Sequence, residues 1–396
     1  GLEKRPKLRF PGFDEPWKET VLSSVLTERN EYAEKDGTYE HATLSKEGIY
    51  GKTARYDRDF LVSTENKKYK VTHLGDLCYN PANLKFGVIC LNTYGDAIFS
   101  PIYVTFEIDA SSDPDFIGAY LTRWDFINRA LKYQQGTVYE RMAVSPEDFV
   151  SIKCCFPQKA EQTRLAEFIT LLDNRIAAQG KYVESLKKYK RGVVRTLLSP
   201  KHCSIKNVKW TTSRIGDIGT FIKGAPLSKA DISLEGTPFI LYGELYTTYN
   251  EVISNVVRKT QASVDKQYYS QIGDVIIPTS GETPEEISTA SCVMLPDIIL
   301  AGDLNIYRCT QVDGRIMSYI LNHVVNDRIA RIAQGKSVVH VQAAELSKIE
   351  ITYPDPFSQK TIIAILAAIS DRIDQSNAEL RLLHELRKAL LQKLFI

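Results

Sequence analysis

Three short stretches of the sequence contain residue types that could carry out chemistry. The stretch YNPAN, which begins at Tyr79, is close to the Asn/Asp-Pro-Pro-aromatic motif with which adenine methyltransferases grip a flipped base. The tripeptide GKS at 335–337 matches the end of a phosphate-binding P-loop. Cys154 and Cys155 are adjacent thiols. These stretches raise methyl transfer, nucleotide binding and metal or redox chemistry as candidates.

Each stretch departs from the pattern that its chemistry needs. Ala82 and Asn83 replace the second proline and the aromatic residue, which favours a strand-ending turn. A P-loop needs a glycine where Ala330 stands, and it links a strand to a helix, whereas GKS follows a helix-like run. The cysteine pair lies on a β-type run that ends at Pro157, which is typical of a core strand. We therefore predict no catalytic residue, and for GKS a turn that faces a phosphate or a base.

The composition excludes several classes of protein. The chain has 396 residues, a formal net charge of +2, 43% apolar residues and 25% charged residues, as ordinary globular proteins do. It has no apolar run near the ~18 residues of a membrane span, and its charged first residues lack the apolar region of a secretory signal. The seven scattered cysteines form no CxxC, and the histidines lack paired spacing, so we expect no metal site. The cysteine pattern favours a reducing cytoplasm.

Two long amphipathic segments, Arg164–Ser199 and Thr361–Phe395, repeat one another. A shift of 197 positions places Arg175 on Arg372 without a gap. Apolar residues recur in each segment at alternating spacings of four and three, which predicts a coiled-coil seam. The seam residues are Leu165, Ile169, Leu172, Ile176, Val183 and Leu186 in the first segment and Ile362, Leu366, Ile369, Ile373, Leu380 and Leu383 in the second.

Polar residues interrupt both seams at matching places, Gln179 with Ser376 and Lys190 with Arg387. Shared interruptions favour duplication over two unrelated amphipathic helices, which is the alternative. Each helix of about 36 residues would be about 55 Å long. Helices of that length should hold other parts of the protein apart.

The segments around these helices also repeat. Each contains a Gly-Asp pair before an apolar run (HLGDLCYNP at His73, QIGDVIIPT at Gln271), a Gln-Gly loop after a helix-like run, and a short strand ending in proline. The sequence predicts an α+β protein with two similar mixed α/β globules. We place the first globule at 1–156, the first helix at 157–199, the second globule at 200–353 and the second helix at 354–396.

Several of these stretches resemble the specificity subunits of type I restriction-modification systems. The opening PKLRFPGFDEPWKETVL, the segment FPQKAEQTRLAEFITLLDNRIAAQGKYVESLKKYKRGVVRTLLS and the tail RIDQSNAELRLLHELRKALLQKLF carry the resemblance, which covers essentially the whole chain. One departure is Ser358, where the family and the first copy, at Glu161, have glutamate. We expect that difference to weaken the cap of the second helix.

The resemblance implies a DNA sequence-specificity subunit. Each globule would be a target recognition domain that reads one half of a bipartite site in double-stranded DNA. The two helices would pack as an antiparallel coiled-coil spacer, related by a pseudo-twofold repeat, that sets the gap and docks other subunits. Two modification subunits would methylate adenine with S-adenosylmethionine, and two restriction subunits would use ATP with Mg²⁺ to cleave. This chain would bind no cofactor and would be a non-catalytic, cytoplasmic subunit.

Basic and hydroxyl- or amide-bearing side chains on projecting loops are the candidates for DNA contacts, because such groups bind phosphates and base edges. In the first globule they are Lys46, Lys52, Arg55, Tyr56, Asn80, Asn83 and Lys85. In the second they are Tyr242, Glu244, Thr247, Thr248, Tyr249, Thr279 and Ser280. The two Gln-Gly loops add Gln135, Thr137, Gln334, Lys336 and Ser337.

Two other readings of the sequence remain as alternatives. One is a non-catalytic coiled-coil scaffold that binds no DNA, whose interactions would be insensitive to salt. The other is a stand-alone DNA methyltransferase, which the absent cofactor motifs disfavour. The run LKKYKRG at 186–192 is either a solvated helix face or part of a docking surface for modification subunits.

Overall fold

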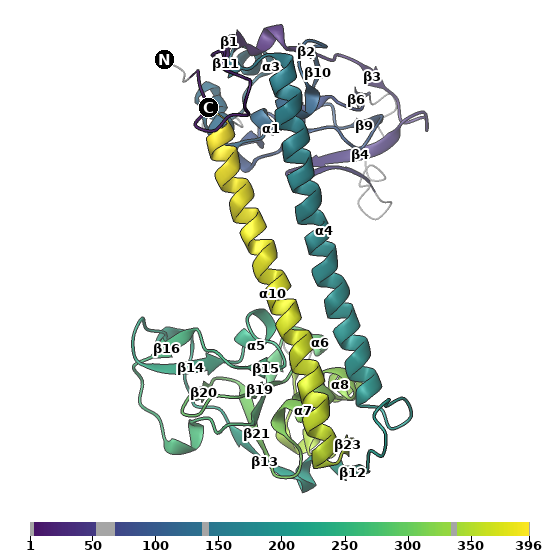
Figure 1. The fold of residues 1–396 in the computed structure, drawn as a ribbon, viewed down its shortest axis with the longest axis vertical. Helices are drawn as coiled ribbons and strands as arrows, with labels where there is room; N and C mark the ends of the chain where they lie inside the picture. Colours follow the sequence, from purple (N-terminus) through teal and green to yellow (C-terminus); the bar gives the residue numbers. More distant parts are fainter. Residues whose placement is uncertain (1–3, 53–67, 137–141, 334–338, 396) are drawn as a thin grey trace. The chain divides into compact units, whose positions relative to one another are not determined.

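The computed structural model describes residues 4–52, 68–136, 142–333 and 339–395, except for the side chain at position 285. These residues form two compact units (Figure 1). Unit 1 contains 1–179 and 380–396, and unit 2 contains 180–379. Each long helix therefore belongs partly to both units, so the packing divides the chain differently from the four successive segments expected from the sequence.

Unit 1 is built from short strands and short helices around one end of each long helix. Its strands are β1 (Lys18–Val21), β2 (Leu26–Glu28), β3 (Tyr32–Ala33), β4 (Glu40–Ser45), β5 (Gly48–Gly51), β6 (Tyr69–Thr72), β7 (Leu77–Tyr79), β8 (Ile89–Leu91), β9 (Ala97–Phe99), β10 (Val104–Ile108) and β11 (Lys153–Phe156). Its helices are α1 (Pro114–Leu121), α2 (Trp124–Ala130), α3 (Pro146–Val150) and the first half of α4 (Lys159–Leu197). The strands form sheets in the orders β1-β11, β2-β10-β7-β8 and β3-β6-β9-β4-β5.

Unit 2 uses a similar set of elements. Its strands are β12 (Trp210–Arg214), β13 (Gly219–Lys223), β14 (Thr237–Leu241), β15 (Val252–Ile253), β16 (Arg258–Thr260), β17 (Asp274–Pro278), β18 (Ser280–Gly281), β19 (Ser291–Val293), β20 (Ile299–Ala301), β21 (Leu304–Cys309), β22 (Val339–His340) and β23 (Glu350–Pro354). Its helices are α5 (Glu244–Thr247), α6 (Pro284–Ile287), α7 (Gly314–His323), α8 (Asn326–Ile332), α9 (Ala343–Leu346) and most of α10 (Pro356–Leu394). The sheets have the orders β12-β23, β13-β21-β17-β19-β15, β16-β14-β20 and β18-β22.

A buried glutamine joins each long helix to the globular part of its unit. In unit 1, the Gln162 amide donates to the carbonyl of Pro157 (2.9 Å) and accepts from the backbone N–H of Asp113 (2.9 Å). Gln359 in unit 2 bonds in the same way to Pro354 (2.8 Å) and Asp313 (2.8 Å). The two aspartates are the N-caps of α1 and α7. One side chain thus connects a strand end, a short helix and a long helix.

The Gly-Asp pairs form the same turn in both units. Asp76 accepts from the backbone N–H of His73 (2.7 Å), and Asp274 accepts from that of Gln271 (2.9 Å). The glycine before each aspartate has a positive φ, 88° at Gly75 and 96° at Gly273, which suits a residue without a Cβ. An arginine then binds each carboxylate, Arg29 at 2.9 Å in unit 1 and Arg308 at 3.1 Å in unit 2.

The long helices place their apolar seam inward. All of the seam positions expected from the sequence are buried or half-buried in the structure. By contrast, Leu171 and Leu382, which lie off the seam, are 68% and 63% exposed. The alternating spacing therefore marks the least exposed face of each helix.

Polar contacts between α4 and α10 occur within each unit. In unit 1, Arg387 of α10 makes two hydrogen bonds to the carboxylate of Asp173 in α4. In unit 2, the guanidinium of Arg372 in α10 lies 5.7 Å from the ring centre of Tyr182 in α4 and donates to its hydroxyl (3.3 Å). Arg387 is one of the polar interruptions of the seam, and its charge is balanced by this partner.

The cap of α10 is intact, which corrects the expectation that Ser358 weakens it. The carboxylate of Asp355 accepts from the backbone N–H groups of Phe357 and Ser358 (both 3.1 Å) and from the Ser358 hydroxyl (2.8 Å). The Ser358 hydroxyl and a further bond from the backbone N–H of Lys209 (3.0 Å), together with the two backbone bonds within the helix, lower the pKa of Asp355 to about 2. Glu161 has a different task, because it is buried and binds Arg9 through two bonds of 2.7 Å.

The end of the chain is part of the core of unit 1. Leu394 and Phe395 are each 3% exposed. The Phe395 ring stacks on Phe116 at 5.6 Å between centroids, and the guanidinium of Arg123 lies 4.8 Å from its centre. None of the helices in the described ranges has the length and apolar content needed to cross a lipid bilayer.

We predict that Phe395→Ala lowers the free energy of unfolding of unit 1 by about 3–4 kcal/mol, because it leaves a cavity beside the aromatic cluster. Hydrogen exchange of unit 1 peptides, read by mass spectrometry, measures the loss. Leu382→Ala is the matched control, since that side chain is 63% exposed and its removal should cost less than about 0.5 kcal/mol. Equal protection in both variants would contradict a core role for the C-terminal residues.

Candidate nucleic-acid interface

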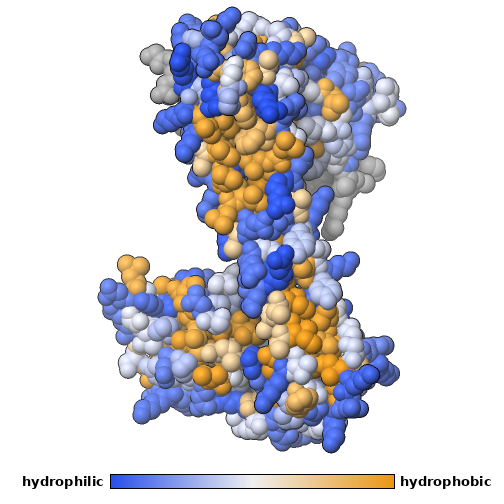
Figure 2. Space-filling model, in the orientation of Figure 1, coloured by the Kyte–Doolittle hydropathy of each residue, from blue (hydrophilic) through white to orange (hydrophobic). Residues whose placement is uncertain are grey.

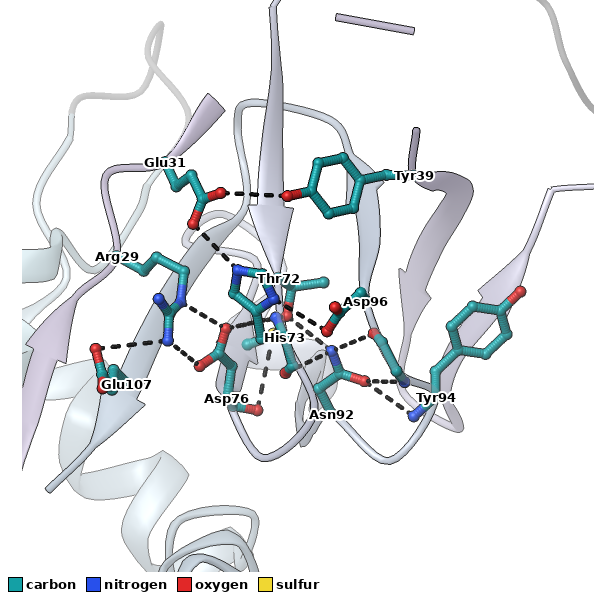
Figure 3. Close-up of polar contacts among 12 residues, drawn as sticks. Arg29, Glu31, Tyr39, Thr72, His73, Asp76, Asn92, Tyr94, Asp96 and Glu107 are labelled. Carbon is teal, nitrogen blue, oxygen red and sulfur yellow. Dashed lines mark hydrogen bonds and ion pairs between the residues drawn. The ribbon is translucent and has the colours of Figure 1, made fainter. Parts of the chain in front are cut away.

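A polar network in unit 1 fixes the turn that precedes β7 (Figure 3). His73 lies between two carboxylates, with Nδ1 3.0 Å from Asp96 and Nε2 3.1 Å from Glu31. Burial acts to lower the pKa of His73, but the two acidic partners outweigh it and the pKa is raised above 6.5. Asn92 closes the network by donating to Thr72 (2.9 Å) and to the carbonyl of His73 (2.8 Å). The network holds the loop that precedes β7 in place.

We predict that His73→Gln destabilises the protein more at pH 6 than at pH 9. The raised folded-state pKa means that the charged imidazole contributes stability that is complete below about pH 6.5 and is lost as pH rises through the folded-state pKa. Urea unfolding of both proteins at the two pH values measures the difference. The double variant Glu31→Gln, Asp96→Asn should abolish this pH dependence. A His73→Gln effect independent of pH would show that His73 is not held as the imidazolium.

The residues predicted for DNA contact in unit 1 lie in different environments. Asn80 is 5% exposed, and its side-chain oxygen Oδ1 accepts from the backbone N–H groups of Ala82 (3.1 Å) and Asn83 (3.2 Å). Asn80 therefore stabilises a turn. Asn83 and Lys52 are half-buried, and Lys46, Lys85 and Gln135 are exposed. Six predicted positions, three in each globule, lie outside the described residues: Arg55, Tyr56, Thr137, Gln334, Lys336 and Ser337.

Lys85 has an apolar neighbour that the sequence analysis did not select. Its ammonium lies 5.1 Å from the centre of the Phe86 ring, which is 60% exposed. Gln135, by contrast, donates to Asp148 (2.8 Å) and is occupied within the unit. Lys46 pairs with its neighbour Glu47 at 3.4 Å, an exposed pair that is easily exchanged for another anion.

Unit 2 contains two adjoining cavities that bring predicted residues together. The larger, about 870 Å³, has Thr279, Lys223 and His340 in its wall. The smaller, about 660 Å³, has Tyr242 and Thr247 in its wall. Both share the turn at 302–303, so residues from widely separated segments of the chain line one concave region. The remaining predicted residues of unit 2, Thr248, Tyr249 and Ser280, do not line either cavity.

The carboxylate of Glu244 is occupied within the smaller cavity. Glu244 is 4% exposed, and it accepts from Arg258 Nε (2.8 Å) and from the backbone N–H of Leu241 (3.0 Å). Arg258, which the sequence analysis missed, keeps 42% of its side chain exposed. Glu244 therefore neutralises and orients an arginine at the cavity wall, and the guanidinium is the group that faces outward.

Asp303 was also missed by the sequence analysis, and it stands between the two cavities. The turn that carries it is held by backbone bonds from Gly302 to Ala225 (2.8 Å) and from Thr279 to Asp303 (2.8 Å). Gly302 has a φ of 81°, which explains the glycine. Asp303 is exposed, and its Oδ2 accepts from the hydroxyl of Ser280 (2.7 Å). Ser280 thus orients a carboxylate at the mouth of the concave region.

Asn305 contributes a buried donor to the larger cavity. Its side chain is 2% exposed, and within the described residues its Nδ2 has no hydrogen-bond acceptor. Unpaired buried donors are uncommon in folded proteins and are usually satisfied by water or a ligand. The wall of this cavity therefore contains a buried N–H donor that has no acceptor among the described residues.

An ion triad joins α4 to the globular part of unit 2. Lys190, a polar interruption of the seam, pairs with Glu251 (2.8 Å), whose other oxygen lies 2.7 Å from Nε2 of His323. Burial acts to raise the pKa of Glu251, but His323 and Lys190 outweigh it and lower the pKa to about 2. The triad ties the loop that follows α5 to the long helix. No group of three or more metal-binding side chains occurs among the residues that the structure describes.

We predict that Glu251→Gln destabilises unit 2 by on the order of 3 kcal/mol at pH 7, since it leaves Lys190 buried beside a neutral partner. The lowered pKa of Glu251 means that its contribution is complete above pH 4.5 and is lost as pH falls toward 2. The gap between wild type and variant in urea unfolding should therefore shrink from pH 5 to pH 3. Glu345→Gln, in an exposed pair with Lys348, is the control and should change little. A constant gap would contradict a charged Glu251.

Comparison with known proteins identifies the fold around this region. The family model of the type I restriction modification DNA specificity domain matches residues 207–384. This segment belongs to that family. The specificity domain thus covers the globular part of unit 2, with both cavities, and most of α10, and the resemblance seen in the sequence is confirmed. No curated protein sequence matches the chain.

Solved structures extend the likeness beyond the specificity domain. The S subunit of a type I restriction-modification system from M. genitalium has a TM-score of 0.59 and 16% identity, with 99% of each chain covered. A chain from a structure on complex assembly and conformational transition of the type I R-M system has a TM-score of 0.60 and 16% identity, with 98% of each chain covered. At this identity the likeness shows that the fold is shared along the whole chain.

Proposed function

We propose that this chain is the DNA sequence-specificity subunit of a type I restriction-modification complex. Each unit is a target recognition domain that reads one half of a bipartite site, and α4 and α10 form the spacer between them. The observation that carries the proposal is the specificity domain in unit 2, together with contacts that recur in unit 1. Two modules on one spacer would bind a target in which two defined blocks of sequence flank an unread gap. Dimeric regulators bind the two halves of a palindrome in a similar way.

The recurrence of unusual contacts supports duplication of one module. The buried glutamines Gln162 and Gln359 make the same two bonds, and Asp76 and Asp274 close the same turn. In each unit a strand near the start pairs antiparallel with the strand that precedes a long helix, β1 with β11 and β12 with β23. We therefore assign unit 1 the same role as unit 2, related to it by a pseudo-twofold repeat. Because the side chains of the two modules differ, the half-sites need not match.

The contacts between the helices support an antiparallel spacer. The Arg387–Asp173 pair in unit 1 joins the end of α10 to the first half of α4, and Arg372–Tyr182 in unit 2 joins residues nearer the middle of both. Residue numbers rise along one helix as they fall along the other. With the buried seams, this order is that of an antiparallel coiled coil.

Exposed apolar residues on the helices support docking of the modification subunits. Figure 2 shows hydrophobic residues gathered on the visible face of unit 1 between α4 and α10. Leu171 in α4 and Leu382 and Leu386 in α10 are among the exposed apolar residues of this unit. Contiguous exposed apolar surface is typical of a protein interface. The run at 186–192 adds Lys187, Lys188 and Arg191 on α4 in unit 2.

Catalysis belongs, in this proposal, to the partner subunits. Two modification subunits supply S-adenosylmethionine chemistry at adenine, and two restriction subunits use ATP and Mg²⁺. This chain contributes recognition and binds no cofactor. A cytoplasmic location follows from its target and accords with the seven cysteines, all described and all free thiols.

Removing one heptad from each helix tests the spacer. We expect deletion of 177–183 together with 374–380 to shorten the unread gap by up to about three base pairs, because seven residues span about 10.5 Å and a base pair about 3.4 Å. Both half-site sequences should stay the same. The readout is the methylated motif produced with the modification subunit. The full-length variant Asn174→Ser, at an exposed position of α4 outside the apolar surface, is the control for changes on the helix surface, and altered half-site bases in the deletion variant would contradict the spacer role.

A further inference from the structure

The turn at 302–303 presents an exposed carboxylate, that of Asp303, in the concave region of unit 2. It separates the two cavities, and both walls contain residues that were expected at a DNA interface. Backbone bonds to Ala225 and Thr279 hold the turn in place. A contact group at such a position would meet a ligand without a conformational change.

Among the described residues, one of the two carboxylate oxygens of Asp303 accepts a hydrogen bond that orients the group. Ser280 donates to Oδ2 at 2.7 Å. Within the described residues of unit 2, Oδ1 accepts no hydrogen bond and Asp303 forms no ion pair. The group therefore keeps a free acceptor oxygen in the wall that both cavities share.

The other charged groups in the cavity walls are mainly cationic and would attract a polyanion, so the presence of the acidic Asp303 among them needs an explanation. Lys223 lies in the wall of the larger cavity, and Lys229 and Arg258 lie in the wall of the smaller one. Arg258 is partly neutralised by Glu244, whereas neither lysine forms an ion pair with a residue that the structure describes. A free carboxylate among groups that attract phosphate weakens binding unless it meets a hydrogen-bond donor on the nucleic acid.

In duplex DNA the donors available in the major groove are exocyclic amino groups. Cytosine presents N4–H₂ and adenine presents N6–H₂, whereas guanine O6 and thymine O4 are acceptors. An unpaired carboxylate thus favours the amino groups of cytosine and adenine and repels the carbonyl oxygens of guanine and thymine. Rejection of the wrong base in this way is a common source of specificity.

We propose that Asp303 is a base-reading residue, whose Oδ1 accepts a hydrogen bond from the amino group of an adenine or a cytosine in the half-site read by unit 2. Ser280 is a positioning residue that holds the carboxylate. This inference rests on the proposed function, because it names the chemistry by which that site selects its DNA.

The test maps methylated motifs for complexes of the modification subunit with wild type, Asp303→Ala and Asp303→Asn. In Asp303→Ala, we expect one position of one half-site to lose its preference for A or C by about tenfold. Asp303→Asn keeps an acceptor for Ser280 and adds a donor. It should retain an adenine, whose N6 and N7 suit an amide, but weaken selection of a cytosine. Glu350 is an exposed acid in β23 that lines neither cavity, so Glu350→Ala should leave the motif unchanged.

Each outcome separates this inference from the proposed function. An unchanged motif in both Asp303 variants, with a split motif in wild type, would overturn the role of Asp303 and leave the subunit assignment standing. A change confined to the other half-site would also overturn it. Loss of all methylation by assembled Asp303→Asn complexes would do so too, because that variant preserves size and the Ser280 contact. No split motif in wild type would instead count against the proposed function.

Discussion

The structure depends on the buried glutamine at the start of each long helix. Gln162 and Gln359 each bond a strand carbonyl and the N–H of an aspartate that caps a short helix. Both glutamines are buried, and each amide donates one hydrogen bond and accepts one, so losing either partner would leave an unsatisfied polar group, which typically costs about 1–3 kcal/mol. This requirement fixes the direction in which the helix leaves each globule. The orientation of a recognition surface on the globule is thereby fixed relative to the helix of the same unit.

The two units share this construction but differ in other side-chain contacts. In unit 2 an ion triad at Lys190 ties the loop that follows α5 to α4, while in unit 1 the corresponding arginine, Arg387, pairs with Asp173 of the facing helix. The shared parts are backbone turns and buried amides, and the differing parts include the buried ion triad of unit 2 as well as exposed side chains. That division is what two modules need if they use one scaffold to select different sequences.

Much of the framework was predictable from the sequence, because periodicity and turn chemistry are local signals. The alternating seam foretold which face of α4 and α10 is buried, and the Gly-Asp pairs marked turns that recur. The concave region was only partly predictable. Tyr242 and Thr279 were selected as loop residues, but Arg258, Asp303 and Asn305 were missed, because cavities assembled from distant segments leave no periodic trace.

The measurement that tests the central claim most directly is a genome-wide map of N6-methyladenine in a methylation-free host that expresses this chain with its modification subunit. Two modules on one spacer predict a single motif of two defined blocks around a gap of fixed length. A contiguous motif would show that one unit alone reads DNA. An assembled complex that methylates no motif would contradict sequence recognition by this chain and favour a scaffold.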